Sequence, residues 1–152
     1  MKNAEKIRAR VNDFLHSAFN ILPSKVPLSH QHGTLGERAA KKHLQQLGLK
    51  FLTANFRSDR GEIDLVFRED DCLVFVEVKT RSSEDWVRPA ASVNQRKRRL
   101  LCQTALDYLR LLKNPPVKIR FDIVEVLLQE SAVREVRHLP NTFAMEKPYR
   151  YG

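Results

Sequence analysis

The stretch "CLVFVEVKTR", residues 72–81, decides how this sequence is read. Its first five residues are apolar and rich in valine and phenylalanine, which is typical of a half-buried β-strand. Glu77 and Lys79 follow within the same stretch. They are two residues apart, so a strand places both side chains on one face of the sheet. Another valine would cost less in a core strand, so these charges call for a functional explanation.

The preceding stretch "GEIDLVFRE" (61–69) alternates in the same way and is separated from residue 72 by Asp70 and Asp71. Two alternating runs joined by a short polar turn predict a β-hairpin. A register symmetric about the turn pairs Leu65 with Val76, Phe67 with Val74, Asp64 with Glu77, and Glu62 with Lys79. A slip of one residue would break the apolar face and the polar face together.

The expected Asp64–Glu77 pair is energetically unfavourable. At a separation of about 5 Å and an effective dielectric constant near 20, two carboxylates repel by about 3 kcal/mol. This is a large part of a domain stability of about 5–15 kcal/mol. A divalent cation with oxygen ligands, Mg²⁺ or Mn²⁺, would offset the repulsion. Lys79 would then orient a water or stabilise charge on a substrate, the alternative being an exposed ion-pair cluster without chemistry.

The remaining pattern predicts an α/β chain of the α+β type, with a mixed sheet and the core order α-β-β-β-α-β(-β). The expected elements are helices at 34–47 and 92–113, strands at 50–57, 61–69, 72–81 and 117–129, a returning strand at 132–139, and a loop at 82–91. An extra amphipathic helix is expected at 3–22, followed by a linker at 23–33. The expected division is an N-terminal helix and linker (1–32), a core domain (33–139) and a tail (140–152).

Charge is unevenly distributed along the 152 residues, whose net charge is +9. Residues 61–85 hold three Lys/Arg against eight Asp/Glu, whereas residues 86–120 hold nine against one. Basic segments around an acidic centre suit a protein that holds a polyanion and a cation, the alternative being an uneven surface. No apolar run has the length of a membrane span. The two cysteines lack metal-ligand spacing, which favours a reduced, cytoplasmic setting.

The stretch "NQRKRR" (94–99) begins the second long helix with four consecutive cations. Positive charge in a first turn opposes the helix dipole by about 0.3–1 kcal/mol per residue, so an anionic partner is the better explanation. We therefore expect nucleic-acid phosphate contacts, which position a backbone without reading its bases. The candidates are Gln95, Arg96, Lys97, Arg98 and Arg99, together with Arg81 at the end of the strand expected at 72–81.

"GEIDLV" followed by "VFVEVKTR" resembles the D…ExK signature of restriction-endonuclease-like and Holliday-junction-resolvase-like nucleases. More specifically, residues 33–128 resemble the bacterial YraN-like family, through "GERAAKKHLQQLG", "NFRSDRGEIDLV", "QRKRRLL" and "RFDIVEV". The resemblance implies a restriction-endonuclease-like core, metal ligands at Asp64 and Glu77, and a catalytic lysine at Lys79. It also implies an auxiliary catalytic carboxylate at Glu37.

Glu37 has an alternative explanation in its local sequence. "TLGE" (34–37) matches a helix capping box, in which Thr34 caps the helix and Glu37 reaches back to it. Such a glutamate stabilises a helix by about 1 kcal/mol without touching a metal. It serves both roles only if the helix begins beside the acidic face of the hairpin.

Together, these features predict a Mg²⁺- or Mn²⁺-dependent endonuclease that hydrolyses phosphodiester bonds in DNA, with branched or flap structures suggested by analogy with resolvases. RNA is left open as a substrate. The alternative is a nucleic-acid-binding or scaffolding protein that keeps the nuclease fold without catalysis. Resolvase-like nucleases often act as symmetric dimers, so the resemblance also allows a homodimer.

Overall fold

The computed structural model describes residues 29–82 and 93–145. Its elements are α2 (Ser29–Gln46), β1 (Lys50–Ser58), β2 (Gly61–Glu69), β3 (Cys72–Ser82), α3 (Gln95–Leu111), β4 (Lys118–Gln129) and β5 (Ala132–Phe143). The helix expected at 3–22 and nearly all of the loop expected at 82–91 lie outside the described residues.

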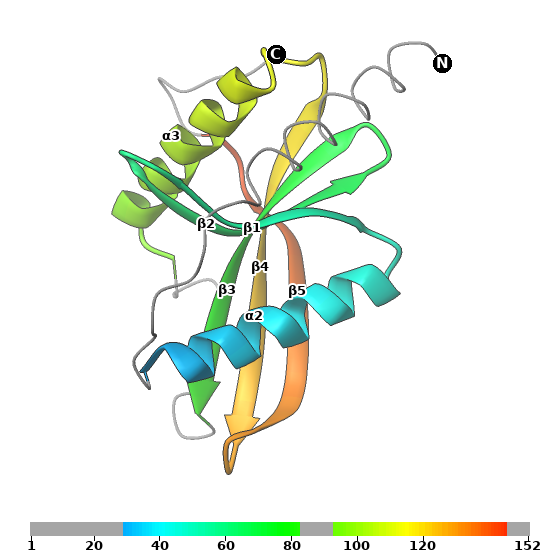
Figure 1. The fold of residues 1–152 in the computed structure, drawn as a ribbon, viewed down its shortest axis with the longest axis vertical. Coiled ribbons are helices and arrows are strands. Elements are labelled where there is room, and N and C mark those ends of the chain that lie inside the picture. Colours follow the sequence, from blue (N-terminus) through cyan, green and yellow to red (C-terminus); the bar gives the residue numbers. More distant parts are fainter. Residues whose placement is uncertain (1–28, 83–92, 146–152) are drawn as a thin grey trace, which may run out of the picture.

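The strands form one mixed sheet in the order β1-β2-β3-β4-β5 (Figure 1). Strands β3 and β4 pair in parallel and are connected through α3, while the other neighbours pair antiparallel. A parallel pair requires a crossover connection, and α3 lies within this one. The expected α+β fold, with its order of elements, is therefore confirmed.

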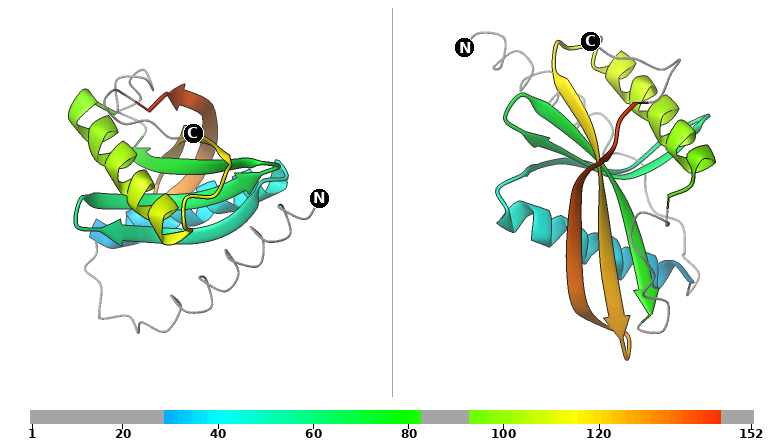
Figure 2. Two further views of the ribbon diagram at one scale, coloured as in Figure 1. Left: turned by 90° about the horizontal axis from the view of Figure 1, so that it is seen from above. Right: turned by 180° about the vertical axis from the view of Figure 1, so that it is seen from behind.

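Each face of the sheet is covered by one helix, and each helix encloses its own core. On the α3 face, helix residues such as Leu101, Tyr108 and Leu109 pack on Phe75 and Phe121. The core on the α2 face is formed by Ala40, Leu44, Leu65, Phe67, Val74, Val76, Val124 and Val126. Figure 2 shows the two helices from further directions. Because both faces are buried, a charged side chain pointing from β3 needs a specific partner.

The β2–β3 hairpin has the predicted register in its apolar part, with Leu65 opposite Val76 and Phe67 opposite Val74. The pairing ends at Leu65–Val76, so the expected ladder partnerships of Asp64 and of Glu62 with β3 are wrong. Beyond this point the strands separate, because the start of β2 stays with β1 while β3 continues with β4 (Figure 1). Asp64 and Glu77 are the first residues past the last paired position.

The inward alternation of β2 also breaks at Asp64. Ile63 belongs to the core under α3 and Leu65 to the core under α2, although residues two apart in a regular strand share a face. The strand therefore changes orientation at Asp64, as expected where it leaves one neighbour and follows the other.

Three sequence-based expectations about element ends and exposure are wrong. Helix α2 begins at Ser29, so Thr34 lies inside the helix and cannot be its N-cap. Strand β5 continues past Pro140 to Phe143, whose ring stacks on Phe121 at 4.8 Å between centroids. Leu47 and Leu100, expected in the core, are 54% and 37% exposed. Leu47 directly follows the last residue of α2, whereas Leu100 lies within α3 beside the buried Leu101.

Helix α2 crosses β3 so closely that only glycine fits at residue 36. A Cβ atom on Gly36 would lie 1.9 Å from Thr80 Oγ1 and 3.1 Å from Thr80 Cβ. We expect Gly36→Ala to lower the free energy of unfolding by about 1–3 kcal/mol, because the helix must move off the strand. Urea unfolding followed by circular dichroism measures this change.

Gly33 provides a matched control in the same helix. A Cβ atom there meets nothing within 4 Å. We expect Gly33→Ala to stabilise the protein by about 0.5–1 kcal/mol, because alanine loses less backbone entropy than glycine in a helix. Equal effects of the two substitutions would contradict the close approach of α2 to β3.

Candidate functional site

The candidate site lies where β2 and β3 separate, and Asp64 occupies the point of separation. Its Oδ2 atom accepts a hydrogen bond from the backbone N–H of Val78 at 2.7 Å. The carboxylate thus satisfies a β3 backbone donor beyond the end of the β2–β3 ladder. This contact holds Asp64 beside the segment that carries Glu77 and Lys79.

The Asp64 carboxyl group is strongly perturbed. Burial, followed by the negative charge of Glu77, raises its pKa to about 7. The hydrogen bond from Val78 and the positive charge of Lys97 oppose this rise only in part. A carboxyl group that titrates near neutral pH beside another carboxylate is typical of functional sites.

Glu77 is buried, with 5% of its surface exposed, and is held by two ammonium groups. Its Oε1 atom lies 3.2 Å from Lys79 Nζ and 3.3 Å from Lys97 Nζ. Its Oε2 atom is also buried and has no hydrogen-bond partner within the described part of the chain. An ionised carboxylate offers about four acceptor positions, so this oxygen retains capacity for a further ligand.

Glu37 reaches the same region from α2. Its Oε2 atom accepts a hydrogen bond from Asn55 Nδ2 at 3.2 Å. Burial raises the pKa of Glu37, and the Glu62 and Glu77 carboxylates add to the rise. Because α2 begins five residues before Thr34, the capping-box explanation for Glu37 is wrong. Glu37 instead interacts electrostatically with Glu77 and Asp64, and these three carboxyl groups are called the acidic cluster below.

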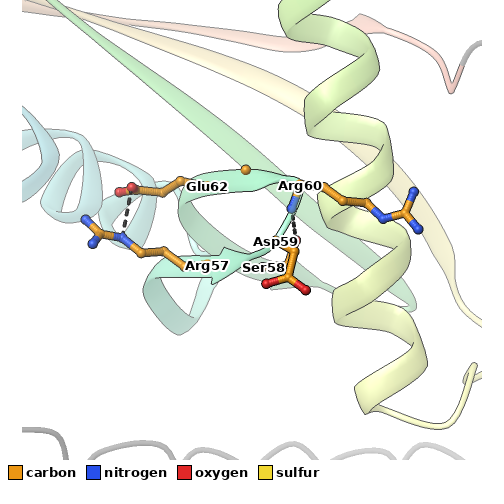
Figure 3. Close-up of a pocket in the computed structure, with 6 residues that line it drawn as sticks. Arg57, Ser58, Asp59, Arg60 and Glu62 are labelled. Carbon is orange, nitrogen blue, oxygen red and sulfur yellow. Dashed lines mark hydrogen bonds and ion pairs between the residues drawn. The ribbon is translucent and has the colours of Figure 1, made fainter.

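A pocket of about 500 Å³ lies at the turn between β1 and β2 and is lined by residues 57–62 (Figure 3). Within it, Arg57 Nε lies 3.0 Å from Glu62 Oε2. Arg60 points toward α3, where its Nε lies 3.5 Å from Asp107 Oδ2. Glu62 acts electrostatically on Glu37, so this pocket borders the acidic cluster.

The expected phosphate-binding residues occupy different environments. Gln95, Arg96 and Arg99 are exposed at the start of α3. Arg98 instead folds inward: its Nε donates to the Val93 carbonyl at 3.0 Å and its guanidinium lies 5.4 Å from the centre of the Phe143 ring. Lys97 lies at Glu77 rather than in the exposed group.

Arg81 lies further along β3, away from the α3 residues, and acts electrostatically on Glu125 of β4. Glu125 is fully buried, and its Oε2 lies 3.7 Å from Arg137 Nη1 of β5, although neither of its carboxylate oxygens has a hydrogen-bond partner among the described residues. In the parallel ladder it is the direct partner of Lys79. A row of polar residues therefore extends from Glu77 through Lys79 on β3 to Glu125 on β4.

Sequence reasoning missed the roles of Asn55, Glu125 and Lys97 in this cluster. Asn55 carried one usable signal, because asparagine tolerates a positive φ, and its φ is 53°. Asn55 lies within β1, but the β1–β2 pairing passes from Ala54 to Phe56 without it, at the point where its amide meets Glu37. Glu125 and Lys97 gave no such signal, since their positions depend on how β4 and α3 pack on β3.

Asp122 is buried on β4 but belongs to a separate network. It accepts hydrogen bonds from Arg120 Nε at 3.0 Å and from the backbone N–H of Asn141 at 2.9 Å, and His138 Nε2 lies 2.8 Å away. Burial alone would raise the pKa of Asp122, but the contacts with His138, Arg120 and Asn141 outweigh it and lower the pKa. Arg120 also contacts Glu69. This satisfied network supports the pairing of β4 with β5.

Asp64 and Glu77 are the residues that fit a hard divalent cation such as Mg²⁺ or Mn²⁺. Glu77 has a buried oxygen that receives no hydrogen bond from the residues that the structure describes, and its charge raises the pKa of Asp64. No three His, Cys, Asp or Glu side chains within residues 29–82 and 93–145 form a complete metal cage. Mg²⁺ is commonly held by one or two carboxylates, with waters and phosphate oxygens completing the shell, and Asp64 and Glu77 would supply two.

The fold and the site define an α+β protein in which a mixed sheet lies between two helices and two strands separate at a buried carboxylate–lysine cluster. Within the described ranges, no helix combines the length and apolar character required to cross a membrane.

Residues 36–126 match the family described as "Uncharacterised protein family UPF0102". A UPF0102 protein of Trichlorobacter lovleyi is 38% identical over 112 residues, covering 73% of this chain and 88% of the relative. One from Coxiella burnetii strain RSA 331 is 39% identical over 122 residues, covering 78% and 97%. A UPF0102 protein of Psychromonas ingrahamii is 39% identical and covers 69% and 85%. The chain belongs to UPF0102, the YraN family, as the sequence motifs indicated.

Proposed function

We propose that this protein is a nuclease that hydrolyses phosphodiester bonds in DNA with the help of a divalent cation, Mg²⁺ or Mn²⁺, held by Asp64 and Glu77. One observation carries the proposal: buried Glu77 shares one oxygen between Lys79 and Lys97, and its other oxygen has no hydrogen bond from any described residue, beside an aspartate with a pKa of about 7. A sheet built only for stability would gain more from apolar residues there.

The cation would polarise the scissile phosphate and lower the pKa of a bound water. Lys79 has the position to assist, because its Nζ is anchored 3.2 Å from Glu77 Oε1 and its side chain is still 30% exposed. From there it can hold the attacking water or stabilise negative charge on a phosphate oxygen. Glu37, fixed by Asn55 at the edge of the cluster, can accept a hydrogen bond from a water.

The exposed cations at the start of α3 would hold the nucleic-acid backbone. Arg96 and Arg99 are exposed near Lys97, which itself reaches the acidic cluster. Backbone contacts made by Arg96 and Arg99 would then lie on the same helix turn as Lys97 of the candidate centre. Arg81 extends the basic character along β3. Such contacts bind phosphates irrespective of sequence, which suits an enzyme selective for nucleic-acid shape.

The test is a cleavage assay with labelled single-stranded, duplex, flap and four-way-junction DNA, in Mg²⁺, Mn²⁺ or EDTA. We expect metal-dependent cleavage of at least one substrate. We expect Lys79→Ala and Glu77→Gln each to reduce the rate by about 10²–10³-fold, because each removes charge acting at the reacting phosphate. Lys113→Ala, an exposed lysine beyond the end of α3, is the control and should cleave normally.

If DNA is bound but uncut under every metal condition, and Lys79→Ala binds it with equal affinity, the proposed nuclease activity is contradicted. This result would support the alternative, a non-catalytic nucleic-acid-binding protein. The exposed cations of α3 are the observation that favours this alternative. An RNA panel run in parallel separates a wrong substrate from an absent activity.

A further inference from the structure

Two ammonium groups compete for one oxygen of Glu77. Lys79 Nζ lies 3.2 Å and Lys97 Nζ 3.3 Å from Oε1, and they come from β3 and α3 respectively. With Asp64 and Glu77 both ionised, the two lysines already balance the charge of the pair. A divalent cation added to this cluster would leave an excess of two positive charges, so at least one ammonium group must move to another anion.

Lys97 is the group that can move. Its side chain is 38% exposed, compared with 30% for Lys79. Its backbone is fixed, because its N–H donates to Asn94 Oδ1 at 2.9 Å in the N-cap of α3, so movement is confined to the side chain. Lys79 lies on the same strand as Glu77, flanked by the β3–β4 ladder. The start of α3, with exposed Arg96, is where a phosphate would receive Lys97.

We propose that Lys97 is an internal counter-ion of Glu77 that couples metal binding to phosphate binding. Without metal, Lys97 neutralises Glu77. When a divalent cation binds at Asp64 and Glu77, Lys97 is released toward the nucleic-acid backbone, and a bound backbone in turn draws Lys97 away from Glu77. Metal and nucleic acid therefore strengthen each other's binding, by the same factor in both directions. This inference rests on the proposed function, because it assumes the metal centre.

The test measures binding on the full chain and does not require turnover. Mn²⁺ affinity is determined by titration calorimetry for the wild type, Lys97→Met, Lys97→Arg and Lys113→Met. Each is measured alone and with a phosphorothioate DNA strand whose integrity is checked afterwards. We expect Lys97→Met to bind Mn²⁺ about 3- to 10-fold more tightly than the wild type without DNA, because a partly exposed competing ion pair is gone. Lys97→Arg keeps the cation and should resemble the wild type, as should Lys113→Met.

DNA should raise the Mn²⁺ affinity of the wild type by about 5- to 50-fold, within the usual range of coupling between sites. In Lys97→Met the rise should shrink to about twofold or less, because the shared side chain is absent. An Mn²⁺ affinity of Lys97→Met equal to or weaker than that of the wild type would overturn the counter-ion role.

The Asp64→Asn variant separates this inference from the proposed function. If Mn²⁺ binding depends on Asp64 but is indifferent to Lys97, the coupling is wrong and the metal centre stands. If Mn²⁺ binds the wild type and Asp64→Asn equally, there is no centre at Asp64 and both proposals fail. Circular dichroism of each variant confirms that the fold is kept.

Discussion

Replacing Asp64 with asparagine is expected to stabilise the metal-free protein by about 2–3 kcal/mol at pH 8. Asparagine is close to aspartate in shape, and its side-chain oxygen can still accept the hydrogen bond from Val78 N–H that Oδ2 accepts at 2.7 Å. What it removes is a buried negative charge beside Glu77. Removing the proposed metal ligand would thus make the fold more stable, as expected where stability has been traded for activity.

The size and pH dependence of this gain follow from the pKa of Asp64, which burial and Glu77 raise from 3.8 to about 7. Between these values the folded state keeps a proton that the unfolded chain releases, so the free energy of unfolding falls as the pH rises. The full difference corresponds to roughly 4 kcal/mol, which partial exposure reduces to about 2–3 kcal/mol. Asparagine does not titrate and avoids this loss.

Urea unfolding in EDTA at pH 8, 6 and 4 measures the effect. The stability advantage of Asp64→Asn should be largest at pH 8 and disappear near pH 4, below which both states of the wild type are protonated. Adding Mn²⁺ at pH 8 should narrow the difference in free energy of unfolding between Asp64→Asn and the wild type, because a ligand that binds only the folded wild type stabilises it. A variant less stable than the wild type at pH 8 would show that Asp64 is a structural residue.

Asp122→Asn is expected to act in the opposite direction and destabilise the protein by about 2–4 kcal/mol at pH 7. Asp122 is more deeply buried than Asp64, and its oxygens receive hydrogen bonds from Arg120 and the Asn141 N–H and contact His138. Removing its charge leaves Arg120 with Glu69 but without its buried ionic partner, and weakens the contact with His138, which is destabilising in a core. The β4–β5 pairing beside the network should loosen.

The pH dependence of this second variant is also opposite. The contacts with His138, Arg120 and Asn141 overcome burial and lower the pKa of Asp122, so the stability it provides is present above its ordinary value of 3.8 and is lost as the pH falls further. The penalty of Asp122→Asn should therefore be full at pH 7 and shrink below about pH 4. Urea unfolding tests this, and a neutral substitution at pH 7 would contradict the network.

These two aspartates lie on the same sheet but have opposite electrostatic surroundings. Asp122 contacts Arg120, His138 and the Asn141 N–H, and these contacts lower its pKa. Asp64 has one backbone donor, a carboxylate neighbour and a raised pKa. A carboxylate whose charge is destabilised by its surroundings is the stronger candidate for chemistry, since that charge does not stabilise the fold.

Much of the fold could be predicted from local patterns. Alternation in β2 and β3 determined the hairpin and its register at Leu65–Val76, because a slip would expose apolar residues on both faces. The same alternation made Glu77 and Lys79 conspicuous on one face. The start of α2 at Ser29 and the extension of β5 to Phe143 were less predictable, because capping and packing on Phe121 decide such boundaries.

The sequence by itself determined the α+β class, the strand pairing of the hairpin and the chemical identity of the carboxylate–lysine cluster, since all of these depend on residues near one another in the chain. Only the tertiary structure decided that β2 leaves β3 at Asp64, that Lys97 shares Glu77 with Lys79, and that Glu37 joins the cluster through Asn55. The contacts of Lys97 with Glu77 and of Glu37 with Asn55 join residues 20 and 18 positions apart, so they depend on how α3 and α2 pack on the sheet, which periodicity does not encode.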